Sequence, residues 1–120
     1  MDPLNRAVTN DTLLRAMKAV ELIRELEKES EKLPGSVISG FLYVCSHNAC
    51  HMEAMKEDLK VTDASSSRVT AWLSHFHRLE HRKGLGLIEK IRDPDNRRRL
   101  ILVLTQKGRE LAERIEAELE

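Results

Sequence analysis

A short turn sequence between two apolar segments constrains the fold of this 120-residue chain more than any other feature. The turn is Asp-Pro-Asp-Asn at 93–96, in which proline presets one backbone dihedral and the Asp and Asn side chains bond to neighbouring amides. LGLIEKIR precedes the turn and RRRLILVLT follows it, and both are rich in residues that favour strands. The sequence therefore predicts a β-hairpin wing over about 85–104. Three consecutive arginines lie at or just after its tip: Arg97, Arg98 and Arg99.

The N-terminal part of the chain is expected to form one amphipathic helix over about 10–33. Asn10 or Asp11 would cap its start, and Pro34-Gly35 would end it. Its apolar side chains recur at spacings of three and four and form one stripe: Leu13, Met17, Val20, Ile23 and Leu26. Most of this stripe has no obvious partner within the chain. We therefore expect it to contact a helix of a second subunit rather than a membrane, because the neighbouring segment 25–32 is rich in acids.

Three further helices are expected before the hairpin. The second, over about 36–47 with Ser36 as its cap, is apolar on nearly all sides, which is typical of a buried helix. The third, over about 52–59, is joined by a tight turn to a fourth over about 63–79, which Thr62 would cap. Five side chains make one apolar face of the fourth helix: Val69, Trp72, Leu73, Phe76 and Leu79. Two helices joined by a tight turn and followed by a basic hairpin form a winged helix–turn–helix.

The last helix is expected over 105–120, where Thr105 would cap it and Leu111, Ile115 and Leu119 recur every four residues. The order of elements predicts a single domain over 1–120, mainly α with a small β-hairpin wing. Its winged helix–turn–helix core would span 36–104, between an N-terminal and a C-terminal dimerisation helix.

The formal net charge is zero, but the charges are segregated along the chain. Residues 64–100 hold nine Lys or Arg against four Asp or Glu, whereas the parts on either side are acidic on balance. Charge grouped in this way suggests an anionic partner for the basic third of the chain.

The segment 81–111 resembles the wing and following helix of MarR-type winged-helix transcriptional regulators. The matching residues occur in order at the family's spacing: Gly86, Leu87, Ile88, Glu89, Asp93, Pro94, Arg98, Leu104, Thr105 and Gly108. The segment 59–73 is similar more loosely to the family's turn and recognition helix, and the whole resemblance covers about 36–115. Two departures stand out. Asn96 replaces the acid that usually orients the wing arginine, so this role is weakened or passes to Asp95. The segment 81–87 makes the link between the recognition helix and the wing longer than in the family.

The resemblance implies a homodimeric, sequence-specific regulator of transcription that binds double-stranded DNA at a pseudo-palindromic operator, as a repressor rather than an activator. It implies no cofactor, and it places an effector, where one exists, between the dimerisation helices and the DNA-binding lobe. The face of the fourth helix opposite its apolar side chains is small, polar and basic, which suits the major groove. The expected DNA contacts are Thr62, Ser67, Arg68, Thr70, Ser74, His75, Arg97, Arg98 and Arg99, and the expected dimerisation contacts are Leu13, Met17, Val20, Ile23, Leu26, Leu111, Ile115 and Leu119.

The stretch CSHNACH at 45–51 places two cysteines and two histidines within seven residues. Such side chains bind zinc, but this spacing matches no tetrahedral ligand pattern, and the four groups fall across a helix end and an extended link. We therefore expect a structural role and no metal site, with Cys45 as a small core residue and 49–51 as a link that can pair briefly with the wing. A metal-responsive or redox-responsive regulator remains an alternative.

Other classes of protein find little support in the sequence. No apolar run approaches the length of a membrane span, and the N-terminal residues lack a secretory pattern, so a cytoplasmic protein is expected. The glycines Gly84 and Gly86 precede a strand rather than a helix, so they do not form a phosphate-binding loop, and we expect no enzyme activity. A winged-helix module that binds only proteins is the remaining alternative.

Overall fold

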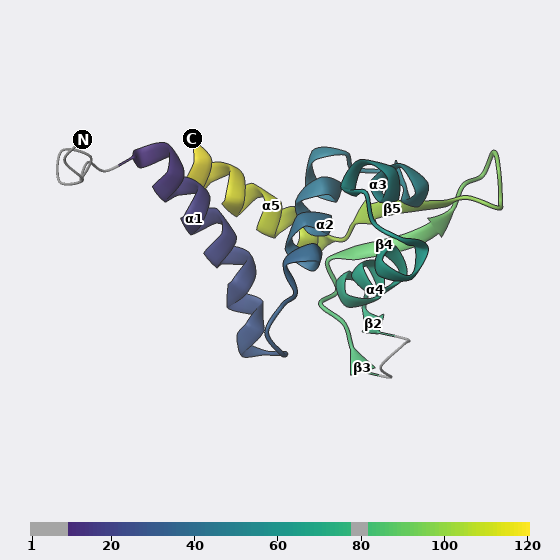
Figure 1. The fold of residues 1–120 in the computed structure, drawn as a ribbon, viewed down its shortest axis with the longest axis horizontal. Coiled ribbons are helices and arrows are strands. Elements are labelled where there is room, and N and C mark those ends of the chain that lie inside the picture. Colours follow the sequence, from purple (N-terminus) through teal and green to yellow (C-terminus); the bar gives the residue numbers. More distant parts are fainter. Residues whose placement is uncertain (1–9, 78–81) are drawn as a thin grey trace.

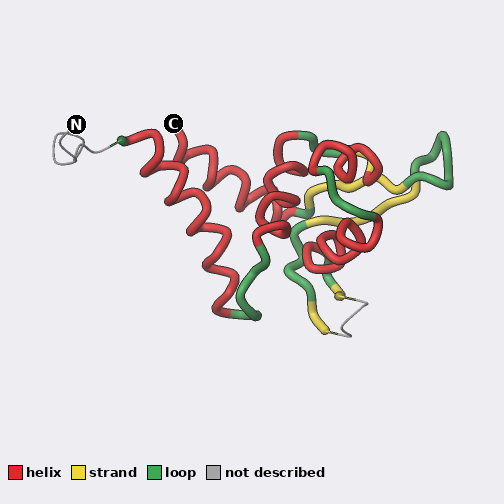
Figure 2. The backbone as a smooth tube through the Cα atoms, viewed as in Figure 1, coloured by secondary structure: helices red, strands yellow, loops and turns green. Residues whose placement is uncertain are grey.

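The computed structural model describes residues 10–77 and 82–120. Figures 1 and 2 show an arm of two helices on one side and a lobe with a small sheet on the other. In chain order the elements are α1 (Asp11–Arg24), the 3₁₀ turn η2 (Glu25–Lys28), α2 (Gly35–Ser46), β1 (Cys50–His51), α3 (Met52–Leu59), α4 (Asp63–Leu73), β2 (Phe76–His77), β3 (Arg82–Lys83), β4 (Ile88–Arg92), β5 (Leu100–Leu104) and α5 (Gln106–Leu119).

The arm consists of α1 and α5, which pack against each other. Asn10 caps α1 by accepting a hydrogen bond of 3.1 Å from the amide of Leu13. Ile23 is fully buried, and Leu111 and Ile115 of α5 are nearly so. The expectation that most of the first helix's apolar stripe has no partner in the chain is therefore wrong for its C-terminal half. The helix also ends earlier than expected, because the backbone tightens into η2 after Arg24.

The lobe packs α2, α3 and α4 against the sheet around one apolar core. Phe41 of α2, Met55 of α3 and Leu73 of α4 are each buried to 1% exposure or less. The helix α2 begins one residue before the predicted cap Ser36, with Pro34 at its N-cap. Val37, Phe41 and Val44 of α2 face the core, whereas Ser39 and Leu42 are exposed, so the expectation that the second helix is buried on nearly all sides is met by one face only.

The wing is an antiparallel hairpin whose strands β4 and β5 pair from Ile88 opposite Leu104 to Arg92 opposite Leu100. The short strand β1 adds to the other edge of β5, with Cys50 opposite Leu102, so the sheet order is β1-β5-β4. The predicted hairpin and the predicted pairing of 49–51 with the wing are both confirmed. The fold class is confirmed as mainly α with a small β wing in a winged helix–turn–helix arrangement.

The fourth helix ends at Leu73 and not near residue 79. The chain returns along its last turn, and the amides of Leu85 and Leu87 donate to the carbonyl oxygens of Trp72 and Leu73 at 2.8 and 2.7 Å. These backbone bonds hold the last-turn carbonyls that a longer helix would have bonded internally. Gly86 adopts a φ of +69°, which glycine tolerates without strain.

This early end changes the surroundings of the next residues. Phe76 lies in β2 and is 51% exposed, so the expectation that it packs in the core is wrong. The expected core residue Leu79 lies outside the described residues. Trp72 is buried as expected, with the guanidinium carbon of Arg82 4.1 Å from its ring centroid. Within residues 10–77 and 82–120, no helix has the length and apolar character that crossing a membrane requires.

Candidate nucleic-acid interface

The helix–turn–helix consists of α3, a tight turn and α4. Lys60 makes the turn by adopting a left-handed conformation with φ +55°, and the amide of Val61 bonds back to the carbonyl of Lys56. Thr62 then caps α4, because its hydroxyl accepts a hydrogen bond of 3.1 Å from the amide of Ser65. The sequence predicted this cap. The first turn of α4 therefore offers amide groups and an exposed Thr62 to the solvent.

The exposed face of α4 is narrower than the sequence suggested. Ser67 and Arg68 are exposed, as expected for groove contacts. The expected outward placement of Thr70 is wrong, because its side chain is fully buried and its hydroxyl donates to the carbonyl of Ser66 at 3.0 Å. Ser74 is half-buried, and its hydroxyl donates to the carbonyl of Thr70 at 2.6 Å. His75 is exposed but lies beyond the end of the helix.

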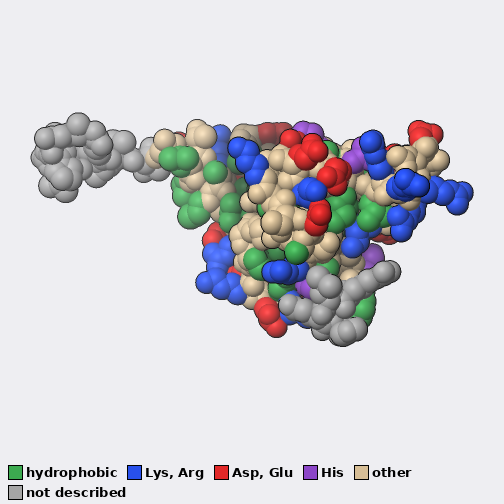
Figure 3. Space-filling view, turned by 45° about the vertical axis from the view of Figure 1, so that its right-hand side comes forward, with side chains coloured by type: hydrophobic (Ala, Val, Ile, Leu, Met, Phe, Trp, Pro, Cys, Tyr) green, Lys and Arg blue, Asp and Glu red, His purple; other side chains and the backbone are tan. Residues whose placement is uncertain are grey.

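Hydrogen bonds to the backbone hold the wing loop that carries the three arginines. The side-chain oxygen of Asn96 accepts from the amide of Arg98 at 3.1 Å, and Arg92 donates to the carbonyl of Arg97 at 3.1 Å. Arg97, Arg98 and Arg99 are all exposed, and no carboxylate in the described parts of the chain pairs with them. Neither Asn96 nor Asp95 therefore orients a wing guanidinium here. Figure 3 shows Lys and Arg side chains gathered at this end of the molecule.

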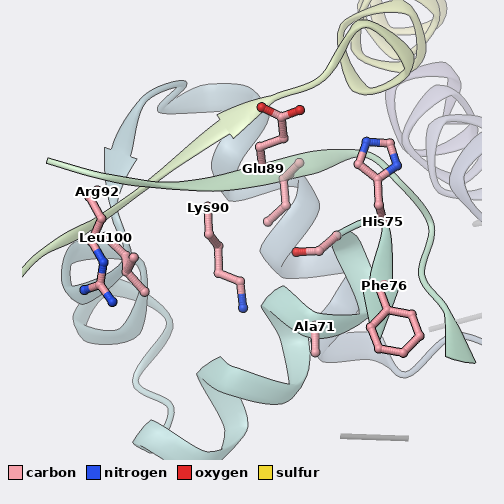
Figure 4. A pocket seen from close by; sticks show the side chains of 9 residues that line it. Ala71, His75, Phe76, Glu89, Lys90, Arg92 and Leu100 are labelled. Carbon is pink, nitrogen blue, oxygen red and sulfur yellow. The ribbon is translucent and has the colours of Figure 1, made fainter. Parts of the chain in front are cut away.

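A concave surface separates α4 from the wing, and basic side chains line it. One cavity of about 490 Å³ lies between the C-terminal half of α4 and β4, and Figure 4 shows Lys90 and Arg92 extending from β4 beside it. These two residues were missed as candidates. Their alternation along the strand places them on one face and could have identified them. A second cavity of about 460 Å³ lies between the starts of α3 and α4 and the wing, with Ser67, Arg98 and Arg99 in its lining.

The expected dimerisation residues fall into two groups. Ile23, Leu111 and Ile115 are buried by the packing within the arm, while Val20 and Leu26 are half-buried. Leu13, Met17 and Leu119 are 66%, 52% and 49% exposed, near the free ends of α1 and α5, which lie side by side in Figure 1. Together with Leu14, these three exposed side chains form an apolar surface that the described residues leave uncovered.

The cysteines and histidines of 45–51 do not converge on one point. His47 stacks on Tyr43 with ring centroids 4.5 Å apart, whereas His51 contacts Asp93 through its Nε2 at 2.9 Å. No group of three or more metal-binding side chains occurs in the part of the chain that the structure describes. Burial raises the pKa of the Cys45 thiol to about 12 and also raises the pKa of Cys50. Because the thiolate is the form that binds metals and reacts with oxidants, this geometry supports neither a metal site nor a thiol sensor.

The arrangement of arm, helix–turn–helix and wing defines a winged-helix architecture of the MarR type. No protein-family model matches the sequence, and no curated protein is significantly similar to it. The solved structure of MarR is similar with a TM-score of 0.55 and 22% identity, covering 98% of this chain and 81% of that one.

Two further solved structures share this fold. PcaV from Streptomyces coelicolor, in complex with its natural ligand, is similar with a TM-score of 0.54 and 19% identity, over 94% of this chain and 77% of that one. Overoxidized AbfR bound to DNA has a TM-score of 0.57 and 16% identity, over 87% of this chain and 69% of that one. The resemblance to MarR-type regulators is thus confirmed at the level of the fold.

Proposed function

We propose that this protein is a transcriptional regulator that binds double-stranded DNA as a homodimer. The observation that carries the proposal is the exposed arginine loop at 97–99, of which Arg98 and Arg99 line the same cavity as Ser67 of α4. The DNA-bound structure of AbfR, which has the same fold, supports the proposal. The resemblance in sequence favours a repressor. The proposal places the protein in the cytoplasm and gives it no catalytic step.

In this proposal α4 enters the major groove. Ser67 is small enough to allow close approach, and Arg68 would read a guanine edge or contact a phosphate. Thr62 and the free amides of the first turn of α4 would bind a backbone phosphate. Arg97, Arg98 and Arg99 would contact the flanking minor groove or its phosphates. Lys90 and Arg92 would face the duplex between α4 and the wing loop.

A second copy of the chain would cover the apolar surface of Leu13, Leu14, Met17 and Leu119. A two-fold dimer would place its two recognition helices about 34 Å apart, one turn of the double helix. The target is therefore proposed to be a pseudo-palindromic site.

A small-molecule effector is also part of the proposal. A cavity of about 320 Å³ lies between the end of α1 with η2 and the start of α5, with Leu22, Leu26, Leu87, Lys107, Glu110 and Arg114 in its lining. The structure of PcaV with its natural ligand shows that a protein of this fold binds one. Because this cavity joins the arm to the lobe, a ligand there would shift the relative position of the two.

Selection from random duplexes tests the proposal. The wild-type chain is expected to enrich a sequence with two-fold symmetry and to bind it more tightly than a scrambled duplex. A variant with alanine at 97, 98 and 99 is expected to bind both poorly. Failure to bind any duplex at low salt would contradict the proposal and favour a protein-interaction module. Repeating the binding measurement with zinc or with EDTA tests the metal-responsive alternative, which requires a change in the affinity for the duplex.

A further inference from the structure

The segment 48–51 holds the wing at three places along its length. Near one end of β5, the side-chain oxygen of Asn48 accepts a hydrogen bond of 3.0 Å from the amide of Leu104. In the middle, the backbone of Cys50 and His51 pairs with β5. Near the loop, the His51 imidazole Nε2 lies 2.9 Å from the Asp93 carboxylate Oδ2. Because β5 separates β1 from β4, this last contact spans the sheet from one edge to the other.

Asp93 makes the hydrogen bonds that fix the base of the arginine loop. One carboxylate oxygen, Oδ1, accepts from the amide of Asp95 at 2.9 Å, while the other faces His51. The amide of Asp93 donates to the carbonyl of Arg99 at 3.0 Å and closes the loop. The side chain of Asp93 is only 12% exposed. The hydrogen bond from His51 is the largest of the effects that lower the pKa of Asp93, so the carboxylate is held ionised.

We infer that His51 is a positioning residue of the wing, and that its charge state sets how firmly the arginine loop is held against the helix–turn–helix. A protonated imidazole makes a charge-assisted hydrogen bond to the carboxylate, about twice as strong as the bond from a neutral ring. A wing held in place before binding loses less freedom on contact with DNA. The inference rests on the proposed function, because duplex affinity is its functional readout.

The charged groups that face His51 come from α3, α4 and the wing. Besides Asp93, the cavity that His51 lines contains Glu53, Lys56, Asp63, Arg98 and Arg99. Lys56 is paired with Glu53 at 2.9 Å and with Asp63 at 2.7 Å, and Asp95 contacts the Asp93 carboxylate through its amide. Cys50, the other residue of β1, carries a thiol whose pKa is raised by burial and which is neutral near pH 7.

The direction of the pH dependence follows from the charges of Asp93 and His51. The contribution of Asp93 is present above the lowered pKa of its carboxylate and is lost as pH falls through it. The charge on an imidazole is present below its titration range, which for histidines lies between about pH 5 and pH 8. The contact is therefore strongest in mildly acidic solution and weakens as the pH rises through that range.

Duplex binding measured by fluorescence anisotropy at fixed ionic strength, from about pH 5.5 to about pH 8, tests the inference. A labelled duplex of mixed sequence is a sufficient probe. The wild-type affinity is expected to fall with rising pH by about twofold to fivefold more than that of His51→Gln, the range of an exposed ion pair. Glutamine can still donate to Asp93 but does not titrate, so this variant should lose the part of the pH dependence that His51 contributes. His51→Ala should bind more weakly than His51→Gln, because it loses the hydrogen bond as well.

The matched control is His47→Gln, which removes an exposed imidazole that stacks on Tyr43 and makes no contact with Asp93. This variant should keep the wild-type pH profile. Parallel profiles for the wild type and His51→Gln would overturn the inference while leaving DNA binding intact.

A second measurement does not depend on DNA. The His51 ring is followed by NMR from about pH 5.5 to about pH 8 in the wild type and in Asp93→Asn, where loss of the carboxylate charge should change how the ring signals depend on pH. An identical pH dependence in the two proteins would overturn the inference whatever the binding data show. Absence of duplex binding at every pH, with a changed pH dependence of the ring signals, would instead overturn the proposed function and the role of His51 in it.

Discussion

Removing one guanidinium group from the wing, by Arg98→Ala, tests the proposed DNA contact most directly. Arg98 is exposed, and no carboxylate in the described residues pairs with its side chain, so its charge is available to a phosphate. Each phosphate that a protein neutralises contributes about 0.9 to the slope of log affinity against log salt. A dimer has two wings, so the variant is expected to lose about 1.8 of that slope if each Arg98 contacts one phosphate.

This change in slope sets the size of the effect. Between about 50 and 200 mM salt, a slope of about 1.8 corresponds to an affinity change of about twelvefold. The wild type should therefore lose about twelvefold more affinity than Arg98→Ala across that interval, on specific and non-specific duplexes alike. The fold should be unaffected, because the side chain makes no packing contact with the core, which circular dichroism and thermal denaturation would verify.

The assay is a fluorescence anisotropy titration at four or more salt concentrations, roughly evenly spaced on a logarithmic scale. Lys28→Ala is the matched control, because it removes one exposed positive charge from η2, which follows α1 and is no part of the helix–turn–helix or the wing. Its slope should equal that of the wild type. An Arg98→Ala slope and affinity equal to those of Lys28→Ala would refute the reasoning and remove Arg98 from the interface.

Four other outcomes are expected. Arg68→Ala should lower the ratio of specific to non-specific duplex affinity, by about tenfold or more if Arg68 reads a guanine, whereas an equal fall in both affinities would identify a phosphate contact. Changing Leu13 and Met17 together to Asp should convert a dimer to a monomer in sedimentation velocity, and a monomeric wild type would contradict the proposed interface. Cys45 should react slowly with iodoacetamide at about pH 8 in the native state and rapidly in urea, because burial raises its thiol pKa to about 12. The free energy of unfolding should fall as the pH rises above about 8.5, where the thiol ionises in the unfolded chain but not in the folded one. Fast labelling of the native protein would reopen the redox alternative. Gly108→Ala should destabilise the fold by about 1–3 kcal/mol or more, because an added Cβ would collide with the carbonyl oxygen of Leu87, and an unchanged Tm would contradict that packing.

Local chemistry explains what the sequence predicted well. The turn at 93–96, the caps Thr62 and Thr105 and the strand-favouring residues of β5 depend on neighbouring residues and backbone geometry, so they can be identified before any tertiary contact is known. The hydroxyl of Thr105 accepts from the amide of Gly108 at 3.1 Å, as a helix cap should.

Two failures arose from hydrogen bonds that the pattern of apolar residues does not reveal. The helical pattern of 63–79 is sound by propensity, but the returning amides of Leu85 and Leu87 bond the last carbonyls of α4 and leave Phe76 on the surface. Thr70 appeared polar and outward, yet a hydroxyl can satisfy itself on the preceding turn and be buried. Periodicity alone reports neither effect.

The sequence by itself determined the class of fold, the arginine loop and the approximate order of helices, because turns, caps and apolar periods are properties of short segments. Only the tertiary structure decided which apolar residues α1 shares with α5 and which remain exposed, since that depends on how two segments almost 90 residues apart meet. It also decided the part played by CSHNACH. Its composition suggests a metal site, but its cysteines and histidines do not converge, and the ring of His51 lies against Asp93, across β5, at the base of the arginine loop.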